Sequence, residues 1–251
     1  MKDMLARGTC DRMGKHIKCD KVIDFAPHVV NGNNSLNHKE ESMEMKRAKW
    51  IVVTGLDGSG KTHLVHRLAD YFQSKGLKVV TAHLPYDTHL QKDILPILTD
   101  RYSDRLLFAL DNRIVAEKIR TWMSEYDVII SQRGWLDSYV HGACQDYSYE
   151  FINELNGFDE LPQADTMIHL VAQAYVAYQR IKDDPDADKF ETLRYIQKQE
   201  IMTRRAYQDL VSRHADMYPM FNAENTLIDT TYLTMDDTYE AAMKFLTSIG
   251  Y

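Results

Sequence analysis

One eight-residue segment constrains this chain more than any other part of its sequence. It reads Gly55-Leu56-Asp57-Gly58-Ser59-Gly60-Lys61-Thr62 and satisfies every specified position of the pattern G-x-x-x-x-G-K-[ST]. An apolar run at Trp50–Thr54 precedes it, and Leu64, Leu68 and Phe72 follow it at helical spacing. A buried strand, a glycine-rich turn and an amphipathic helix are therefore predicted in immediate succession, which is the local structure of a phosphate-binding loop.

The residue types in this loop suit the phosphates of a nucleoside triphosphate. Glycines let backbone N–H groups converge on phosphate oxygens, and the following helix adds the positive end of its dipole. We expect Lys61 to reach the β- and γ-phosphates and Thr62 to ligate Mg²⁺. A glycine-rich turn without a ligand is the alternative, and the agreement of strand, loop and helix disfavours it. The motif predicts nucleotide binding and leaves the reaction undefined.

Apolar strand patterns and helical patterns alternate along the rest of the chain. After Trp50–Thr54, strands are predicted at Leu77–His83, Val128–Ser131, Thr166–Val171 and Thr226–Asp229. Helices are predicted at Gly60–Lys75, Ser103–Glu125, Ala172–Ile181 and Phe190–Arg213, with a closing helix from Asp236. Continuous apolar strands separated by helices indicate an α/β fold with a five-stranded parallel sheet and helices on both faces.

The first 48 residues differ in character from the rest. They are polar and turn-rich around Asn31–Ser35, so we expect an N-terminal extension at residues 1–48 and one domain at residues 49–251. The chain has 30 Lys and Arg against 37 Asp and Glu, which argues against a general nucleic-acid coat but not against a local basic groove. No apolar run is long enough to span a membrane, and three cysteines are too few for a secreted disulfide framework. A cytoplasmic protein is therefore expected.

Three further segments occur in the order that a known family has them. They are Arg105–Arg113 in the second predicted helix, Ile130–Ser138 at the end of the third strand, and Lys189–Glu191 after an acidic stretch. With the phosphate loop, they make the sequence resemble the thymidylate kinase family over about residues 49–250. The resemblance implies a P-loop kinase fold with a mobile lid, ATP and Mg²⁺ as cofactors, and phosphoryl transfer to a pyrimidine deoxynucleotide.

The resemblance also implies roles for single residues. Asp57 would lie near the acceptor sugar or another acceptor hydroxyl, and Phe108 would stack on a pyrimidine ring, although its spacing alone favours a core position. Arg133 would bridge the donor and acceptor phosphoryl groups, which suits its planar guanidinium. Arg180 would contact the nucleotide from the lid, which Lys189–Glu191 would end.

Three positions depart from the family pattern. Gln132 stands where the family has a carboxylate, which puts the usual anchoring of Mg²⁺-bound water in question. Asn112 stands where the family has a base-reading arginine, and we expect it to face the substrate. The family's arginine clamp for the acceptor 5′-phosphate is missing after the second strand, and Asp87 falls near its place. A carboxylate there would repel a monophosphate and could accept a proton from a hydroxyl.

These departures leave three functions open. The favoured one is an ATP-dependent kinase that phosphorylates the hydroxymethyl group of 5-hydroxymethyluracil in DNA, as in a viral branch of the family. The second is a dTMP kinase that makes dTDP, with a phosphate clamp from Arg101 or Arg105. The third is a nucleotide-binding switch without transfer activity, and a homodimer is open for all three. The candidate catalytic residues are Asp57, Lys61, Asp87 and Arg133.

Overall fold

The computed structural model describes residues 47–185, 190–213 and 222–251. Within them, one sheet contains the strands β1 (Lys49–Gly55), β2 (Val79–His83), β3 (Val128–Gln132), β4 (Thr166–Val171) and β5 (Glu224–Asp229). All pairings are parallel, and the order is β2-β3-β1-β4-β5. The predicted five-stranded parallel sheet is confirmed. Nearly all of the predicted extension at residues 1–48 lies outside the described residues, as does Lys189, so the extension and the mobile lid stay predictions.

The strand β1 lies at the centre of the sheet and carries the phosphate loop. Its Val53 pairs with Gln132 of β3 on one side and with Ile168 of β4 on the other. Only Lys49 of this strand is exposed, as expected for a parallel strand covered on both faces. Because the strands are parallel, their carboxyl ends meet at one edge, which is where ligands bind in open α/β sheets.

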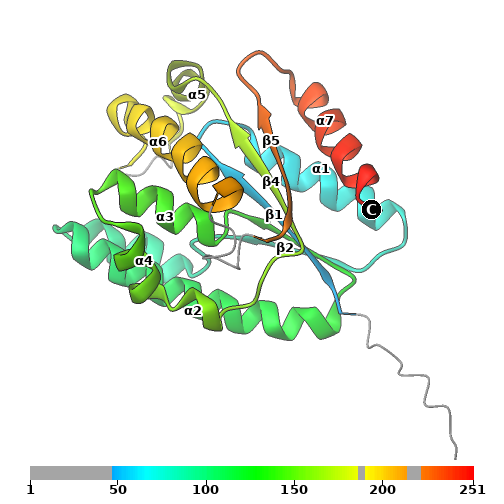
Figure 1. Cartoon of the computed structure of the whole chain (residues 1–251), viewed down its shortest axis with the longest axis horizontal. Coiled ribbons are helices and arrows are strands. Elements are labelled where there is room, and N and C mark those ends of the chain that lie inside the picture. The colour runs from blue at the N-terminus through cyan, green and yellow to red at the C-terminus, as the bar shows by residue number, and fades with distance from the viewer. Residues whose placement is uncertain (1–46, 186–189, 214–221) are drawn as a thin grey trace, which may run out of the picture. The chain divides into compact units, whose positions relative to one another are not determined.

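Helices cover both faces of the sheet (Figure 1). The helices are α1 (Lys61–Ser74), α2 (Arg101–Glu125), α3 (Trp135–Cys144), α4 (Tyr149–Asn156), α5 (Ala174–Ile181), α6 (Leu193–Ala206) and α7 (Met235–Ser248). Figure 1 shows α1 and α7 on one face and α2, α3, α4 and α6 on the other. No helix in the described ranges is both long enough and apolar enough to cross a bilayer.

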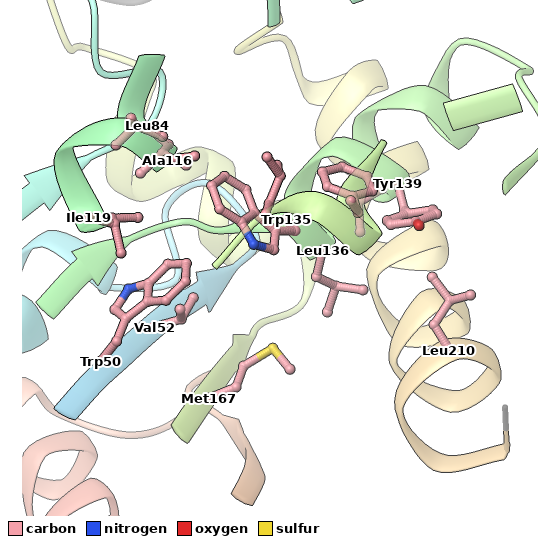
Figure 2. Packing of buried hydrophobic residues seen from close by; sticks show 14 of the residues in the cluster. Trp50, Val52, Leu84, Ala116, Ile119, Trp135, Leu136, Tyr139, Met167 and Leu210 are labelled. Atoms are coloured by element: carbon pink, nitrogen blue, oxygen red, sulfur yellow. The ribbon is translucent and has the colours of Figure 1, made fainter. Parts of the chain in front are cut away.

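Alternating residues of β1 anchor a separate hydrophobic core on each face. Ile51 and Val53 pack with apolar residues of α1 and α7, whereas Trp50 and Val52 face the side covered by α2 and α3. Figure 2 shows this second core, in which Trp50 and Trp135 lie edge to face with ring centroids 5.5 Å apart. The indole N–H of Trp50 also donates to Ser131 Oγ at 3.0 Å. The core therefore fixes the start of α3, directly after β3.

The helical pattern of the sequence differs from the structure in two places. We expected no helix between β3 and β4, but α3 and α4 lie there, and both are short. The second difference concerns α6, which begins at Leu193 because the Thr192 side chain accepts a hydrogen bond from the N–H of Tyr195. It ends at Ala206, and a π-helical segment follows at Tyr207–Arg213.

Candidate active site

The phosphate loop lies between the end of β1 and the start of α1. Two of its glycines allow approaches that no other residue permits. A Cβ atom at Gly55 would lie 1.9 Å from the carbonyl oxygen of Leu170, and one at Gly58 would lie 2.2 Å from that of Ala177. Both glycines also have positive φ angles, of 126° and 78°. The loop is thus held closely against β4 and α5 in a conformation that L-residues with side chains rarely adopt.

The other loop residues differ in what they offer a ligand. The N–H of Leu56 donates to the Leu170 carbonyl at 3.1 Å and its side chain is fully buried, so Leu56 packs the loop against the domain. The Ser59 hydroxyl is buried and has no hydrogen-bond partner in the described part of the chain. Thr62 is exposed near the start of α1. The loop therefore offers two hydroxyl groups near the N-terminus of a helix, which suits phosphate oxygens.

Lys61 and Asp57 form the charged centre of the loop. The Lys61 ammonium donates to the carbonyl oxygens of Gly55 and Leu56, both at 2.8 Å, and to Asp57 Oδ1 at 3.0 Å. The Arg133 guanidinium pairs with the same carboxylate. Burial alone would raise the pKa of Asp57, but the charges of Arg133 and Lys61 hold it well below its usual value. Burial lowers the pKa of Lys61, and the charge of Asp57 opposes that change.

Arg133 reaches this centre from the end of β3. Its φ angle is 68°, a left-handed conformation that is uncommon for a residue with a side chain. Its N–H donates to the Val53 carbonyl at 2.8 Å, and its Nη1 donates to the Leu84 carbonyl at 3.1 Å. These bonds hold the guanidinium at the carboxyl ends of the strands, beside Asp57. The structure thus places Arg133 at the loop, and its bridging role stays a prediction.

A cleft of about 590 Å³ opens beside the loop. This loop cleft is lined by Gly58, Lys61, Thr62, Gln132, Arg133 and Arg180, among others. Arg180, in the last turn of α5, donates to the carbonyl oxygens of Gly58 at 3.2 Å and Thr230 at 2.9 Å. The predicted nucleotide-binding residues Lys61, Thr62 and Arg180 therefore face one space.

The cleft fits a magnesium ion that is bound together with nucleotide phosphates. Thr62 and Gln132 line it, and the side chains of both carry an oxygen atom of the kind that Mg²⁺ accepts as a ligand. No group of three or more His, Cys, Asp or Glu residues that could hold a metal occurs in the described ranges. Mg²⁺ commonly keeps several waters and gains substrate phosphates as ligands, so a dedicated protein cage is not required.

A second pocket, the inner pocket, is lined by residues of α2 and α3 and by Phe190. Asp57, Gln91 and Arg133 line both this pocket and the loop cleft, so the two spaces meet at Asp57 and Arg133. Its free volume is about 60 Å³, below the roughly 300–1,000 Å³ of most small-molecule sites. The rings of Phe108 and Phe190, with centroids 6.4 Å apart, narrow it. A nucleotide would need these side chains to move apart.

The two residues predicted to hold the acceptor both line the inner pocket. Phe108 is half-buried and belongs to an apolar cluster with Leu95, Leu107 and Phe190. Asn112 is buried, and its side-chain amide donates to Ser138 Oγ at 2.9 Å and to Asn156 Oδ1 at 2.7 Å. Asn112 therefore links α2 to α3 and α4 as well as lining the pocket.

Asp87 does not join the other candidate catalytic residues. Its carboxylate accepts hydrogen bonds from the N–H groups of His89 at 2.9 Å and Leu90 at 3.1 Å, and it lines neither the inner pocket nor the loop cleft. This is the geometry of an N-capping aspartate. The structure therefore gives no support to Asp87 as a base. Asp111 lines the inner pocket together with Asp57 and Asp137, and it accepts from the N–H groups of Tyr86 and Asp87, both at 2.7 Å.

Several residues of the site are not predicted from the sequence. Asp137 accepts hydrogen bonds from Thr54 Oγ1 at 2.6 Å and from the Gly134 N–H at 2.9 Å, and burial raises its pKa. His141 also lines the inner pocket, and burial lowers its pKa to about 3, so its ring is neutral. Gln199 of α6 donates to Asp57 Oδ2 at 3.2 Å. The one available signal was the four-residue spacing of Asp137 and His141, which places both on one face of a helix after Arg133.

The sequence and the fold both match known proteins. The family described as Thymidylate kinase matches residues 53–230. A probable thymidylate kinase from Pyrococcus horikoshii is 28% identical over 192 residues, which cover 72% of this chain and 89% of the relative. A thymidylate kinase from Caldicellulosiruptor saccharolyticus is 32% identical over 155 residues, which cover 58% and 75%.

A solved structure agrees at the level of the fold. Thymidylate kinase from Candida albicans superposes with a TM-score of 0.60 at 18% identity, over 81% of this chain and 92% of that one. The matched family segment includes the phosphate loop, Arg133 and the inner pocket residues Phe108 and Asn112. The chain belongs to the thymidylate kinase family and is a P-loop phosphotransferase of that family that uses ATP and Mg²⁺.

Proposed function

We propose that this protein transfers the γ-phosphate of ATP to free dTMP and so forms dTDP. The observation that carries the proposal is that the loop cleft and the inner pocket meet at Asp57 and Arg133. In the reaction, an oxygen of the dTMP phosphate forms a bond to the γ-phosphorus while the bond to the β-phosphate oxygen breaks and ADP leaves. A donor site and an acceptor site that share an arginine suit this transfer, because the migrating group passes between them.

On the donor side, the loop and Lys61 bind the triphosphate. Lys61 exchanges its bonds to the Gly55 and Leu56 carbonyls for phosphate oxygens, and the Ser59 hydroxyl gains a partner. Thr62 and Gln132 would hold a Mg²⁺ ion, which would neutralise phosphate charge when bound. Arg180 closes the side of the loop cleft that adjoins β5. These residues bind and orient ATP.

On the acceptor side, Phe108 provides an apolar wall for the thymine ring, and Arg133 stabilises the charge on the migrating phosphoryl group. Of the two arginines considered as substitutes for the missing clamp, Arg101 is exposed and donates to the Gln145 carbonyl at 2.7 Å. Arg105 is buried and lines the inner pocket. Arg105 and Arg133 both line the pocket, and a guanidinium group can pair with the phosphate of an acceptor.

A kinase that phosphorylates 5-hydroxymethyluracil in DNA is a less well supported function than a dTMP kinase. It depended on Asp87 as a base for a hydroxyl acceptor, and the Asp87 carboxylate caps a turn outside the pocket. The relatives reported above are named thymidylate kinases. The switch reading depended on Gln132, which still lines the loop cleft as an oxygen ligand. The experiment below can still detect either the DNA kinase or the switch.

A homodimer in the cytoplasm belongs to the same proposal. Tyr102, Leu106 and Leu110 are exposed at four-residue spacing along α2, with 44–52% of their surface accessible. Such a stripe of large apolar side chains on one helix face suits burial against a second copy. Light scattering of the purified chain tests this: a mass of one chain would contradict the homodimer.

The test of the function offers one donor to several acceptors. Labelled ATP and Mg²⁺ are incubated with dTMP, with thymidine, and with DNA that contains or lacks 5-hydroxymethyluracil. We expect label in dTDP alone. Label in the modified DNA would restore the DNA kinase, and nucleotide binding without transfer to any acceptor would indicate a switch.

A further inference from the structure

Three consecutive residues of β1 contact the turn that joins β3 to α3. The carbonyl oxygen of Val53 accepts a hydrogen bond from the N–H of Arg133 at 2.8 Å. Gly134 packs so closely on Val52 that a Cβ atom at this glycine would lie 2.8 Å from Val52 Cγ1. The third residue is Thr54, which directly precedes the phosphate loop. The end of β1 therefore connects the loop to the arginine that lines both pockets.

Asp137 of α3 supplies the side chain that completes this contact. Its Oδ2 atom accepts the hydroxyl of Thr54 at 2.6 Å and the N–H of Gly134 at 2.9 Å. Thr54 and Asp137 are both buried, so these bonds are shielded from bulk water. One carboxylate oxygen thus binds the residue before the phosphate loop and the residue after Arg133 at the same time.

The backbone of Arg133 has a conformation that needs such support. Its φ angle is 68°, and a left-handed conformation of a residue with a side chain persists only where its neighbours impose it. The peptide group before Arg133 is held by the bond from its N–H to Val53. The peptide group after it is held by the bond from the Gly134 N–H to Asp137. Removal of Asp137 therefore frees one of the two peptide groups.

We propose that Asp137 is the positioning residue of Arg133, because its hydrogen bonds to Thr54 and Gly134 hold the guanidinium where the loop cleft meets the inner pocket. The inference rests on the proposed function, in which Arg133 stabilises charge on the migrating phosphoryl group. Without Asp137, the peptide after Arg133 rotates and the guanidinium leaves its ion pair with Asp57. Asp137 acts on the transfer through Arg133 and makes no contact with the phosphoryl group.

Direct contact with the acceptor is the alternative role, because Asp137 also lines the inner pocket. A residue that only binds the acceptor changes KM for the acceptor, whereas a residue that positions a catalytic group changes kcat. Burial raises the pKa of Asp137, so its surroundings do not favour its charge. This agrees with a role that requires an oxygen to accept hydrogen bonds and does not require a carboxylate charge.

The first test compares Asp137→Ala with Asp137→Asn. Alanine removes the accepting oxygen, whereas asparagine keeps an oxygen and loses only the charge. We expect kcat with ATP and dTMP to fall about 10- to 100-fold in Asp137→Ala, as for a displaced catalytic group, while KM for dTMP stays within about twofold. Asp137→Asn should retain most of the wild-type kcat. An equal loss in both variants, or a rise in KM without a fall in kcat, would overturn the inference.

Asp165→Ala is the matched control for a loss of stability. Asp165 also binds β1 through its side chain, because its Oδ2 atom accepts the N–H of Trp50 at 2.9 Å. Trp50 lies near the start of β1, at the opposite end from the phosphate loop. Both alanine variants lose hydrogen bonds and should have a lower Tm, but only Asp137→Ala should have a lower kcat. A similar fall of kcat in both would show that kcat follows stability and would overturn the inference.

The double variant Arg133→Ala/Asp137→Ala tests whether Asp137 acts through Arg133. If it does, Asp137→Ala should change kcat by no more than about twofold in the Arg133→Ala background, because no guanidinium remains to be positioned. A further fall as large as that in wild type would show that Asp137 acts on the reaction independently of Arg133, and the inference would be wrong.

The crystal structure of Asp137→Ala provides a result that needs no substrate. We expect the Arg133 guanidinium to move by about 1 Å or more and to lose its ion pair with Asp57, which is enough to impair catalysis. An Arg133 side chain in its wild-type place would overturn the inference, even if the variant were slow. The proposed function fails by a different result, namely that the wild-type protein forms no dTDP, so the two failures are distinguishable.

Discussion

The charged side chains of the loop cleft and those of the inner pocket differ in the partners that they have. At the loop cleft, Lys61 and Arg133 both pair with the Asp57 carboxylate within hydrogen-bond distance. In the inner pocket, two nitrogen atoms of Arg105 have no hydrogen-bond partner in the described part of the chain, and burial raises the pKa of Asp111 against the effect of the two N–H groups whose hydrogen bonds it accepts. The charged side chains of the loop cleft thus pair with one another, whereas those of the inner pocket include a buried guanidinium with unpartnered nitrogen atoms in the described residues.

The largest effect is expected from Lys61→Ala. This variant removes the cation that faces the β- and γ-phosphates, so kcat should fall by roughly 10³-fold or more. Steady-state turnover of ATP and dTMP is the measurement. Lys75→Ala, at the exposed end of α1, serves as the control and should match wild type. Near-normal turnover in Lys61→Ala would show that the loop does not bind ATP productively.

A smaller loss is expected from Arg133→Ala, which removes the residue shared by both pockets. Asp57 keeps its bond to Lys61, so the loop should survive the change. We expect kcat to fall by about 10²- to 10³-fold, with the affinity for an ATP analogue nearly unchanged. Turnover and titration with the ATP analogue, measured on the same variant, separate an effect on kcat from an effect on ATP affinity. If only ATP affinity falls, Arg133 belongs to the loop cleft alone.

Phe108→Ala sharpens the comparison, because it should affect one pocket only. Loss of a stacking ring commonly costs about 1–3 kcal/mol per base, so KM for dTMP should rise about tenfold or more while KM for ATP stays constant. Lys118→Ala, exposed on the same helix, controls for changes in α2. Equal increases in both KM values would mean that the two pockets do not act separately.

A histidine that lines neither pocket provides a further check through the stability of the protein in acid. His169 of β4 is fully buried against Tyr207, neither ring nitrogen has a hydrogen-bond partner among the described residues, and burial lowers its pKa to about 3. In the unfolded chain the pKa of His169 is about 6.5. Below that pH the unfolded chain binds a proton that the folded chain does not, so the free energy of unfolding decreases as the pH is lowered. At pH 5 this amounts to about 2 kcal/mol from His169.

The variant His169→Phe should therefore lose less stability than wild type between pH 7 and pH 5. Denaturant unfolding at both values measures the difference, and His66→Gln on the exposed side of α1 is the control. An unchanged pH dependence in His169→Phe would mean that the His169 ring is not held neutral by burial.

The sequence predicts the loop cleft far better than the inner pocket, for a physical reason. The phosphate loop, its strand and its helix are contiguous, and each depends on local patterns of glycines and apolar residues. The inner pocket combines α2, α3, the turn around Leu84 and Phe190, which meet only in the folded chain. The helix α3 is short, so its apolar residues form only a weak helical pattern in the sequence.

The Asp87 hypothesis shows the same limit. Its carboxylate was placed in the site because it follows β2, but aspartate is also a preferred N-cap, and the N–H groups two and three residues later bind it. Position near a strand end could not distinguish a base from a cap. Arg105 shows the converse, because nothing in its local sequence indicates that its side chain is buried in a pocket.

The smallest effect is expected from Asp87→Asn. Asparagine caps a helical turn about as well as aspartate, so both stability and turnover with dTMP should remain within about twofold of wild type. Turnover with saturating ATP is the measurement. A loss of 10²-fold or more at unchanged ATP affinity would return Asp87 to the role of a general base.

The most direct test of two separate pockets is a titration of dTMP into the protein with and without a non-hydrolysable ATP analogue and Mg²⁺. If the loop cleft holds the donor and the inner pocket holds the acceptor, one dTMP binds per chain whether or not the analogue is already bound. If the analogue displaces dTMP, the two ligands share one site, and the division into a donor cleft and an acceptor pocket is wrong.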